Sequence, residues 1–272
     1  MKEKVPSPQS TVPSPESQIT GPESQVGTAD SGPRTSDSLA DMIASADAET
    51  LNQAGNAFSD RGLWREALAC YERSLELRQA AGDRRGQGIV LNNLGAMYYG
   101  LGDWEQAQQC YAASLEIAQA MGEQSEQLFV LMNLCFLRYA QGQPAEELLA
   151  RAQTLAEALG REQELMRLAW MRGDLAMQRA LAGDDAAYAQ AFAAYAVASG
   201  HAARLGHEHL QQTMSFIDEH LARLEEADQR LAALAFGDYL LAYGQNNNLG
   251  PEFAAHYTTK REELFYQPLL GA

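Results

Sequence analysis

The chain repeats itself with a period of 40 residues. Residues 51–90 align with residues 91–130 without a gap, and 16 of the 40 aligned positions are identical. The identities include Gly55 with Gly95 and Trp64 with Trp104. A fixed period of this size is typical of stacked supersecondary units, because one such unit cannot bury its apolar face alone. The chain is therefore expected to fold as a stack of similar units.

Each unit is expected to contain two helices. Apolar and small residues recur three or four positions apart, which is the spacing of one helix face. Gly62 and Gly102 lie where the first helix of each unit must end, and Gly82 and Gly122 lie where the second ends. Glycine adopts the left-handed conformation that follows a helix at no steric cost. The frequent Ala, Leu, Gln and Glu also favour helix, so the pattern predicts an all-α fold of antiparallel helix pairs.

The two units resemble the tetratricopeptide repeat. The family pattern, Leu-x2-Leu-Gly-x2-Tyr followed by Ala-x3-Phe, is matched twice, by Leu51-x2-Ala54-Gly55-x2-Phe58 with Ala67-x3-Tyr71 and by Leu91-x2-Leu94-Gly95-x2-Tyr98 with Ala107-x3-Tyr111. The period here is 40 residues instead of about 34, and the usual proline after the second helix is missing. The chain is therefore similar to the long-helix variety found in kinesin light chains and in many bacterial signalling proteins. The resemblance implies an α-solenoid, a right-handed superhelix of stacked antiparallel helix pairs, whose first helices line a concave face.

The sequence predicts three regions. Residues 1–45 are rich in Pro, Ser and Gly, so they are expected to be a disordered tail, with a docking motif or modified Ser-Pro sites as the alternative. Residues 46–204 are expected to hold about four helical repeats, of which the last two match the pattern less closely. In the third, Cys135 replaces the glycine and Pro144 replaces the tryptophan. Residues 205–272 are expected to be a helical extension without the repeat's small residues, ending in a short capping helix over residues 252–265.

The implied concave face carries a line of side-chain amides. Counted from the glycine of each unit, the inward positions lie two or three residues before it and one or four after it. The predicted peptide-binding residues are Asn52, Asn56, Asn92, Asn93, Tyr99, Met132, Asn133, Phe136 and Tyr139. Gln53 is the first unit's counterpart of Asn93 and Asn133, and the fourth unit would add Trp170, Asp174 and Met177.

Amides at these positions are suited to an extended peptide. A carboxamide can donate to a peptide C=O and accept from a peptide N–H whatever the side chains are. The aromatic residues and Met132 would add apolar contact and selectivity. The alternative is that the asparagines cross-link neighbouring helices and that the aromatic residues belong to the core between repeats.

The sequence shows no catalytic or metal-binding motif. His207 and His209 are two residues apart, on different sides of a helix, so they cannot share a metal there. The HExxH, Walker A and GxGxxG patterns are absent. Cys70, Cys110 and Cys135 lack CxxC spacing and are expected to be free thiols in a reducing compartment. We therefore expect no enzymatic activity, no cofactor and no metal.

The formal net charge of −16 narrows the choice of partner. An acidic surface repels phosphate backbones, so nucleic acid is not expected, and a basic or neutral protein is the more suitable partner. With no signal peptide and no apolar run of about 18 residues, we expect a cytoplasmic protein without a membrane span. The predicted function is a scaffold or adaptor that binds a partner peptide in its concave groove. The alternative is a regulatory module of a bacterial signalling system, in which an effector changes the curvature of the stack.

Overall fold

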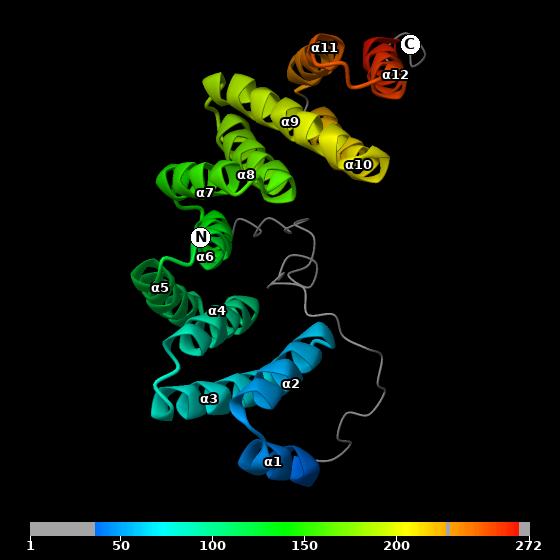
Figure 1. The fold of residues 1–272 in the computed structure, drawn as a ribbon. Helices are drawn as coiled ribbons and strands as arrows, with labels where there is room; N and C mark the ends of the chain where they lie inside the picture. Colours follow the sequence, from blue (N-terminus) through cyan, green and yellow to red (C-terminus); the bar gives the residue numbers. More distant parts are fainter. Residues whose placement is uncertain (1–35, 227–228, 267–272) are drawn as a thin grey trace. The chain divides into compact units, whose positions relative to one another are not determined.

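The computed structural model describes residues 36–226 and 229–266, and every regular element in these ranges is an α-helix (Figure 1). The described residues divide into two compact units, with the division between Leu137 and Arg138. The helices of the first are α1 (Ser36–Ser45), α2 (Ala48–Asp60), α3 (Trp64–Ala80), α4 (Arg84–Gly100), α5 (Trp104–Met121) and most of α6 (Gln124–Ala140). The helices of the second are α7 (Glu146–Ala158), α8 (Glu162–Leu181), α9 (Ala186–Leu205), α10 (His207–Glu226), α11 (Arg230–Asn246) and α12 (Pro251–Tyr266). The predicted all-α fold is confirmed.

Helices of the first unit pack in the predicted pairs, α2 with α3 and α4 with α5, and α3 also packs on α4. Two glycines make the pairs close. A Cβ atom added to Gly55 would lie 2.5 Å from the ring of Tyr71, and one added to Gly95 would lie 2.6 Å from the ring of Tyr111. Each tyrosine ring therefore rests on the backbone of the partner helix, which explains why glycine and tyrosine recur together in the sequence.

The turns between these helices also follow the prediction. Gly62, Gly82, Gly102 and Gly122 have φ angles of 70°, 70°, 78° and 71°, which is the left-handed region. Aspartate side chains then cap two of the helices that follow. Asp83 accepts a hydrogen bond from the backbone N–H of Gly86 at 2.9 Å at the start of α4. Such caps satisfy N–H groups that the first turn of a helix leaves without a partner.

Residues 36–45, which the sequence analysis includes in the tail, form helix α1. Leu39, Met42 and Ile43 recur three or four positions apart and pack against the buried cluster around Phe58 and Tyr71. This contact offsets the entropy of ordering a short helix. Residues 1–35 lie outside the described residues.

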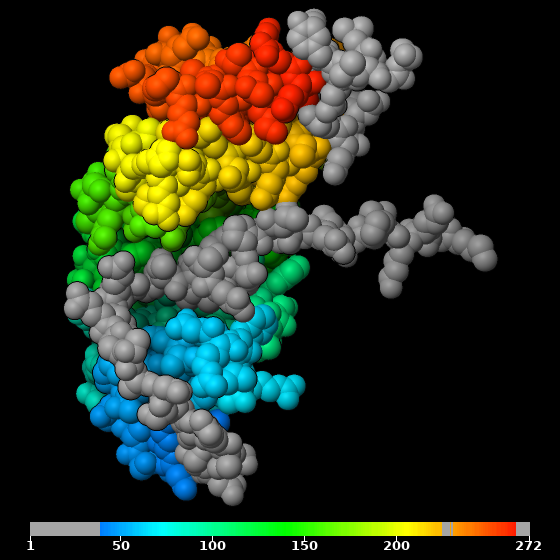
Figure 2. Space-filling model, turned by 90° about the vertical axis from the view of Figure 1, so that its right-hand side faces the viewer, coloured from blue at the N-terminus to red at the C-terminus, as the bar shows by residue number. Residues whose placement is uncertain are grey.

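In the second unit, α8 packs on α9 and keeps the close contact of the repeat. A Cβ atom on Gly173 would lie 2.5 Å from the ring of Tyr195, so the fourth predicted unit is a true helix pair. The helices α10, α11 and α12 follow α9 in the chain, and α11 packs on α9, α10 and α12 (Figure 2). The sequence shows no small-residue marker in this region, yet a Cβ atom added to Gly244 would lie 2.7 Å from the ring of Phe253, the same kind of contact. The last helix, Pro251–Tyr266, is close to the expected range of 252–265.

Candidate peptide-binding site

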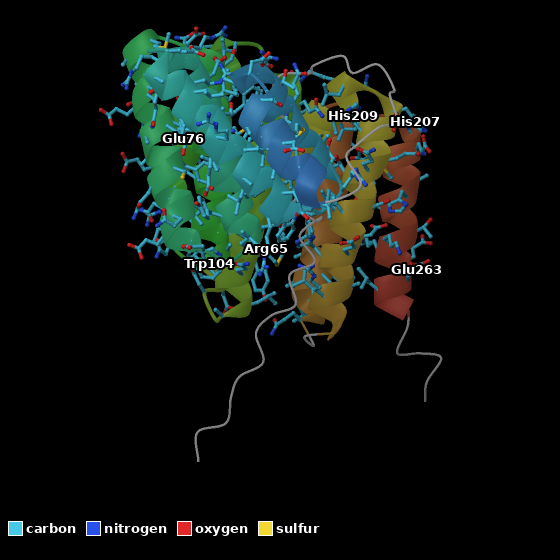
Figure 3. All side chains as sticks on the ribbon, turned by 90° about the horizontal axis from the view of Figure 1, so that it is seen from below. Arg65, Glu76, Trp104, His207, His209 and Glu263 are labelled. Carbon is cyan, nitrogen blue, oxygen red and sulfur yellow. The ribbon has the colours of Figure 1, made fainter. Side chains whose placement is uncertain are left out.

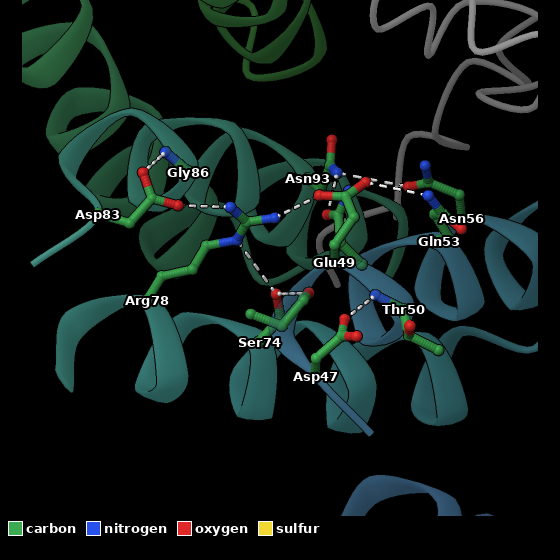
Figure 4. A network of polar contacts seen from close by, with 12 residues as sticks. Asp47, Glu49, Thr50, Gln53, Asn56, Ser74, Arg78, Asp83, Gly86 and Asn93 are labelled. Atoms are coloured by element: carbon green, nitrogen blue, oxygen red, sulfur yellow. Dashed lines mark hydrogen bonds and ion pairs between the residues drawn. The ribbon is translucent and has the colours of Figure 1, made fainter. Parts of the chain in front are cut away.

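The five predicted asparagines lie on α2, α4 and α6, the first helices of three successive repeats. Asn93 donates hydrogen bonds from Nδ2 to Oδ1 of Asn52 at 3.1 Å and to Oδ1 of Asn56 at 3.4 Å (Figure 4). Asn133 donates from Nδ2 to Oδ1 of Asn92 at 2.9 Å. Asn52 is only 7% exposed, whereas the other four are half-buried. The structure thus places the five amides along three successive repeats, bonded in two sets: Asn52, Asn56 and Asn93 in one, and Asn92 and Asn133 in the other.

These bonds cross-link neighbouring helices, which is the alternative role given to the asparagines in the sequence analysis. The side-chain amides nevertheless keep donors and acceptors that these bonds do not use. A carboxamide offers two donors and two acceptor positions. Within the described part of the chain, Nδ2 of Asn92 and Oδ1 of Asn93 have no hydrogen-bond partner. A donor and an acceptor on adjacent, half-buried residues match the C=O and N–H groups of a peptide backbone.

Tyr71 holds the first of these amides in place. Its hydroxyl group donates a hydrogen bond to Oδ1 of Asn56 at 2.7 Å, and its ring lies against Gly55. The burial of Tyr71 raises the pKa of its hydroxyl group well above the ordinary value, so this group remains a donor at neutral pH. The glycine–tyrosine contact therefore also positions the amide line.

The predicted apolar residues divide between the core and the surface. Met132 is 5% exposed and belongs to the core of the first unit. Tyr99 and Phe136 are half-buried in the first unit, and Tyr139 is half-buried in the second. Tyr99 and Phe136 therefore keep enough exposed surface to contact a partner, whereas Met132 does not.

The inward residues expected in the fourth repeat are covered by other helices. Oδ1 of Asp174 accepts a hydrogen bond from the hydroxyl group of Tyr195 at 2.6 Å and lies 2.9 Å from Nε2 of His220. Met177 belongs to the core, and the ring of Trp170 lies 5.3 Å from that of Phe216 on α10. We did not predict this because the repeat pattern does not show that α10 packs over α8.

A pocket that the sequence did not predict lies beside Asn92 and Asn93. It has a volume of about 50 Å³ and is formed by α4, α5 and the start of α6. Its apolar lining includes Gly88, Ile89, Ile117, Ala118, Met121 and Phe129. Arg85 lies at its edge and bridges two carboxylates, Glu123 at 3.1 Å and Glu126 at 3.2 Å. The predicted amides therefore border an apolar pocket with charged groups at its edge.

The cysteines and histidines form no reactive or metal-binding group among the described residues. Cys70 and Cys135 are buried and Cys110 is half-buried, and none of the three forms a disulfide bond. Burial raises the pKa of Cys70 to about 11 and also raises that of Cys110, so neither is an activated thiolate. His207 and His209 both lie in the first turn of α10 (Figure 3). Among the described residues, no group of three or more His, Cys, Asp or Glu side chains could hold a metal ion.

Comparisons with known proteins agree with this architecture. Residues 47–120 match the family model described as tetratricopeptide repeat. The crystal structure of aspartyl phosphate phosphatase F from Bacillus subtilis has a similar fold, with a TM-score of 0.50 and 12% sequence identity. That likeness covers 83% of this chain but only 62% of the other, and at this identity it concerns the fold alone. No curated protein gives a significant match to the sequence. In the described ranges, no helix has the length and apolar character needed to cross a membrane.

Proposed function

We propose, from the match of residues 47–120 to the tetratricopeptide repeat model, that the protein is a scaffold or adaptor that binds a partner peptide along α2, α4 and α6. In this proposal it has no catalytic activity of its own and needs no cofactor or metal. The net charge of −16 favours a basic or neutral partner over an acidic one and disfavours nucleic acid. We place the protein in the cytoplasm, where its three thiols would stay reduced.

One observation supports the proposal most strongly, the position of Asn92 and Asn93 at the edge of the apolar pocket. The two amides would bind the backbone of an extended peptide, because together they present a donor and an acceptor. The pocket beside them would take one side chain of that peptide and so provide selectivity. Tyr99, Phe136 and the remaining asparagines would extend the contact along the same helices.

The test uses a peptide selected from a random dodecapeptide library displayed on phage. The selected peptide is synthesised with a fluorescent label, and its binding to the full chain is measured by fluorescence anisotropy. The variant Asn92→Ala/Asn93→Ala is expected to bind about 30-fold more weakly, because it loses two hydrogen bonds to the peptide that contribute about 1 kcal/mol each. The matched control is Gln108→Ala/Gln109→Ala, which removes two adjacent amides from the exposed surface of α5.

The control is expected to bind like the wild type. Circular dichroism of both variants checks that the helices remain folded. Equal affinity of the two variants for the peptide would contradict the proposed site. Failure to select any binding peptide would contradict the proposed function.

A further inference from the structure

The pocket beside Asn92 has a filled counterpart in the preceding repeat. Residues 74, 78 and 87 of the first repeat correspond to residues 114, 118 and 127 of the second. Two equivalent hydrogen bonds, one from the serine and one from the glutamine, lie beside residue 78 in the first repeat and beside residue 118 in the second. Ser74 donates to the carbonyl of Ala48 at 2.6 Å and Ser114 to that of Gly88 at 2.8 Å. Gln87 donates to the carbonyl of Arg78 at 3.2 Å and Gln127 to that of Ala118 at 3.1 Å.

Within this shared frame, the side chain at the central position differs. In the first repeat, the Arg78 side chain is only 11% exposed, and its guanidinium lies 2.6 Å from both Glu49 and Asp83 (Figure 4). In the second repeat, the corresponding residue is Ala118, whose side chain ends at Cβ. The pocket of about 50 Å³ is therefore the place that an arginine side chain occupies one repeat earlier.

The residues around the pocket differ from those around Arg78 in the first repeat, but they still suit a long basic side chain. The counterpart of Glu49 is Ile89, which makes one wall apolar. The counterpart of Asp83 is Glu123, so a carboxylate remains at the edge, and Glu126 adds a second. The methylene groups of Arg or Lys can cover an apolar wall while the charged end reaches a carboxylate.

We propose that this pocket receives an arginine or lysine side chain of the partner peptide, in the place that Arg78 fills in the preceding repeat. The inference rests on the proposed function and specifies the chemistry of the partner. Ile89, Ile117 and Phe129 contact the methylene groups, and Glu123 and Glu126 bind the cationic end.

Charge favours a basic side chain over an aliphatic one. Two carboxylates at the edge face one guanidinium, that of Arg85, which leaves a net charge of −1 there. The Arg85 side chain is 56% exposed, and exposed ion pairs of this kind are weak, so it can move aside for a second cation. The net charge of −16 on the whole chain attracts the same kind of partner. A glutamate in the pocket would be repelled both by the negative charge at the edge of the pocket and by that of the whole chain.

The experiment uses four labelled heptapeptide mixtures with a fixed central residue, Arg, Lys, Leu or Glu, and random residues elsewhere. Binding to the full chain is measured by fluorescence anisotropy at low ionic strength. The Arg and Lys mixtures are expected to bind about tenfold more tightly than the Leu and Glu mixtures, as expected for a partly desolvated charge pair.

Two variants fill the pocket. Ala118→Arg restores the side chain that the first repeat holds in the same frame, and Ala118→Met fills the space without adding charge. Both are expected to weaken binding of the Arg mixture to the level of the Glu mixture. The matched control is Ala112→Arg, which adds the same charge at an exposed position of α5 and should leave binding unchanged. Thermal unfolding of each variant confirms that the repeat is intact.

The outcomes separate this inference from the proposed function. If all four mixtures bind the wild type equally, and only Asn92→Ala/Asn93→Ala loses this binding, the peptide-binding function stands and the basic pocket is wrong. Tighter binding of the Leu mixture would also overturn the inference, because the pocket would then be an aliphatic one. If no mixture binds, both the pocket and the peptide-binding function are contradicted.

Discussion

At the scale of single residues, three of the helix pairs share a close contact between a glycine on one helix and a tyrosine ring on the other. We predict that Gly95→Ala destabilises the protein by about 1–3 kcal/mol, because its Cβ would lie 2.6 Å from the ring of Tyr111 and the packed ring cannot withdraw. Gly100→Ala in the same helix is the control, since its Cβ would lie 3.4 Å from Trp64, an ordinary contact. Urea unfolding of both variants measures the effect. Equal stability of the two would contradict this explanation of the close spacing between the helices.

A second residue-scale prediction concerns acid. The backbone N–H of Gly86 and the guanidinium of Arg78 hold the pKa of Asp83 below its ordinary value of 3.8. A lowered pKa in the folded state means that the ionised group stabilises the fold above pH 3.8 and that this contribution is lost as pH falls through the folded pKa. Asp83→Asn should therefore lower the melting temperature at pH 7, and the difference from wild type should shrink at pH 3. A difference that grows in acid would contradict the assigned interactions.

Contacts that recur between repeats could be predicted from the sequence. The pocket could not, because it lies where one repeat lacks a side chain that the preceding repeat has. Gly55, Gly95 and their tyrosines were found because a repeated contact leaves a repeated pattern. The repeat pattern indicates that the asparagines lie on three successive first helices, but it does not decide whether they bond to one another. The alignment of the two repeats pairs Arg78 with Ala118, and this difference is the sequence signal for the pocket. Only the structure shows that the Arg78 side chain fills a space between helices.

At the scale of helices, the same tyrosine contact is used with two different acceptors. In the pair α2–α3, Tyr71 donates to the neutral amide of Asn56 at 2.7 Å, whereas in the pair α8–α9, Tyr195 donates to the carboxylate of Asp174 at 2.6 Å. Hydrogen bonds to charged groups contribute about 1.5–3 kcal/mol and those between neutral groups about 1 kcal/mol. We predict that Tyr195→Phe destabilises its unit more than Tyr71→Phe destabilises the other.

Urea unfolding, followed by far-ultraviolet circular dichroism, measures this comparison. Phenylalanine keeps the ring against the glycine in both variants, so the difference reports the hydroxyl group alone. A larger loss of stability in Tyr71→Phe would contradict the role given to Asp174.

Helix boundaries were predicted well where glycine marks a turn, and poorly where packing decides. The turns at Gly62, Gly82, Gly102 and Gly122 lie where the sequence places them. Helix α1 was assigned to the tail because its composition continues that of the preceding residues, and only its contact with the first repeat explains why it folds. The predicted groove in the fourth repeat was wrong for a similar reason, since α10 covers Trp170 and Asp174.

At the scale of the whole molecule, the two candidate roles differ in their effect on shape. The proposed site lies within residues 1–137, so peptide binding does not require the second unit to move. We predict that the radius of gyration, measured by small-angle X-ray scattering, stays the same when a selected peptide saturates the protein. A clear change would favour the alternative, an effector-sensing regulatory module, over a rigid adaptor.

The most direct measurement of peptide binding at the pocket uses isoleucine, because the chain has only five, at positions 19, 43, 89, 117 and 217. Two of them, Ile89 and Ile117, line the pocket, whereas Ile217 is buried in the second unit. Isoleucine δ1-methyl groups labelled with carbon-13 are observed by NMR during titration with a selected peptide. We predict that the signals of Ile89 and Ile117 shift while that of Ile217 does not. Peptide binding that shifts Ile217 and leaves both pocket methyl groups unchanged would contradict the account.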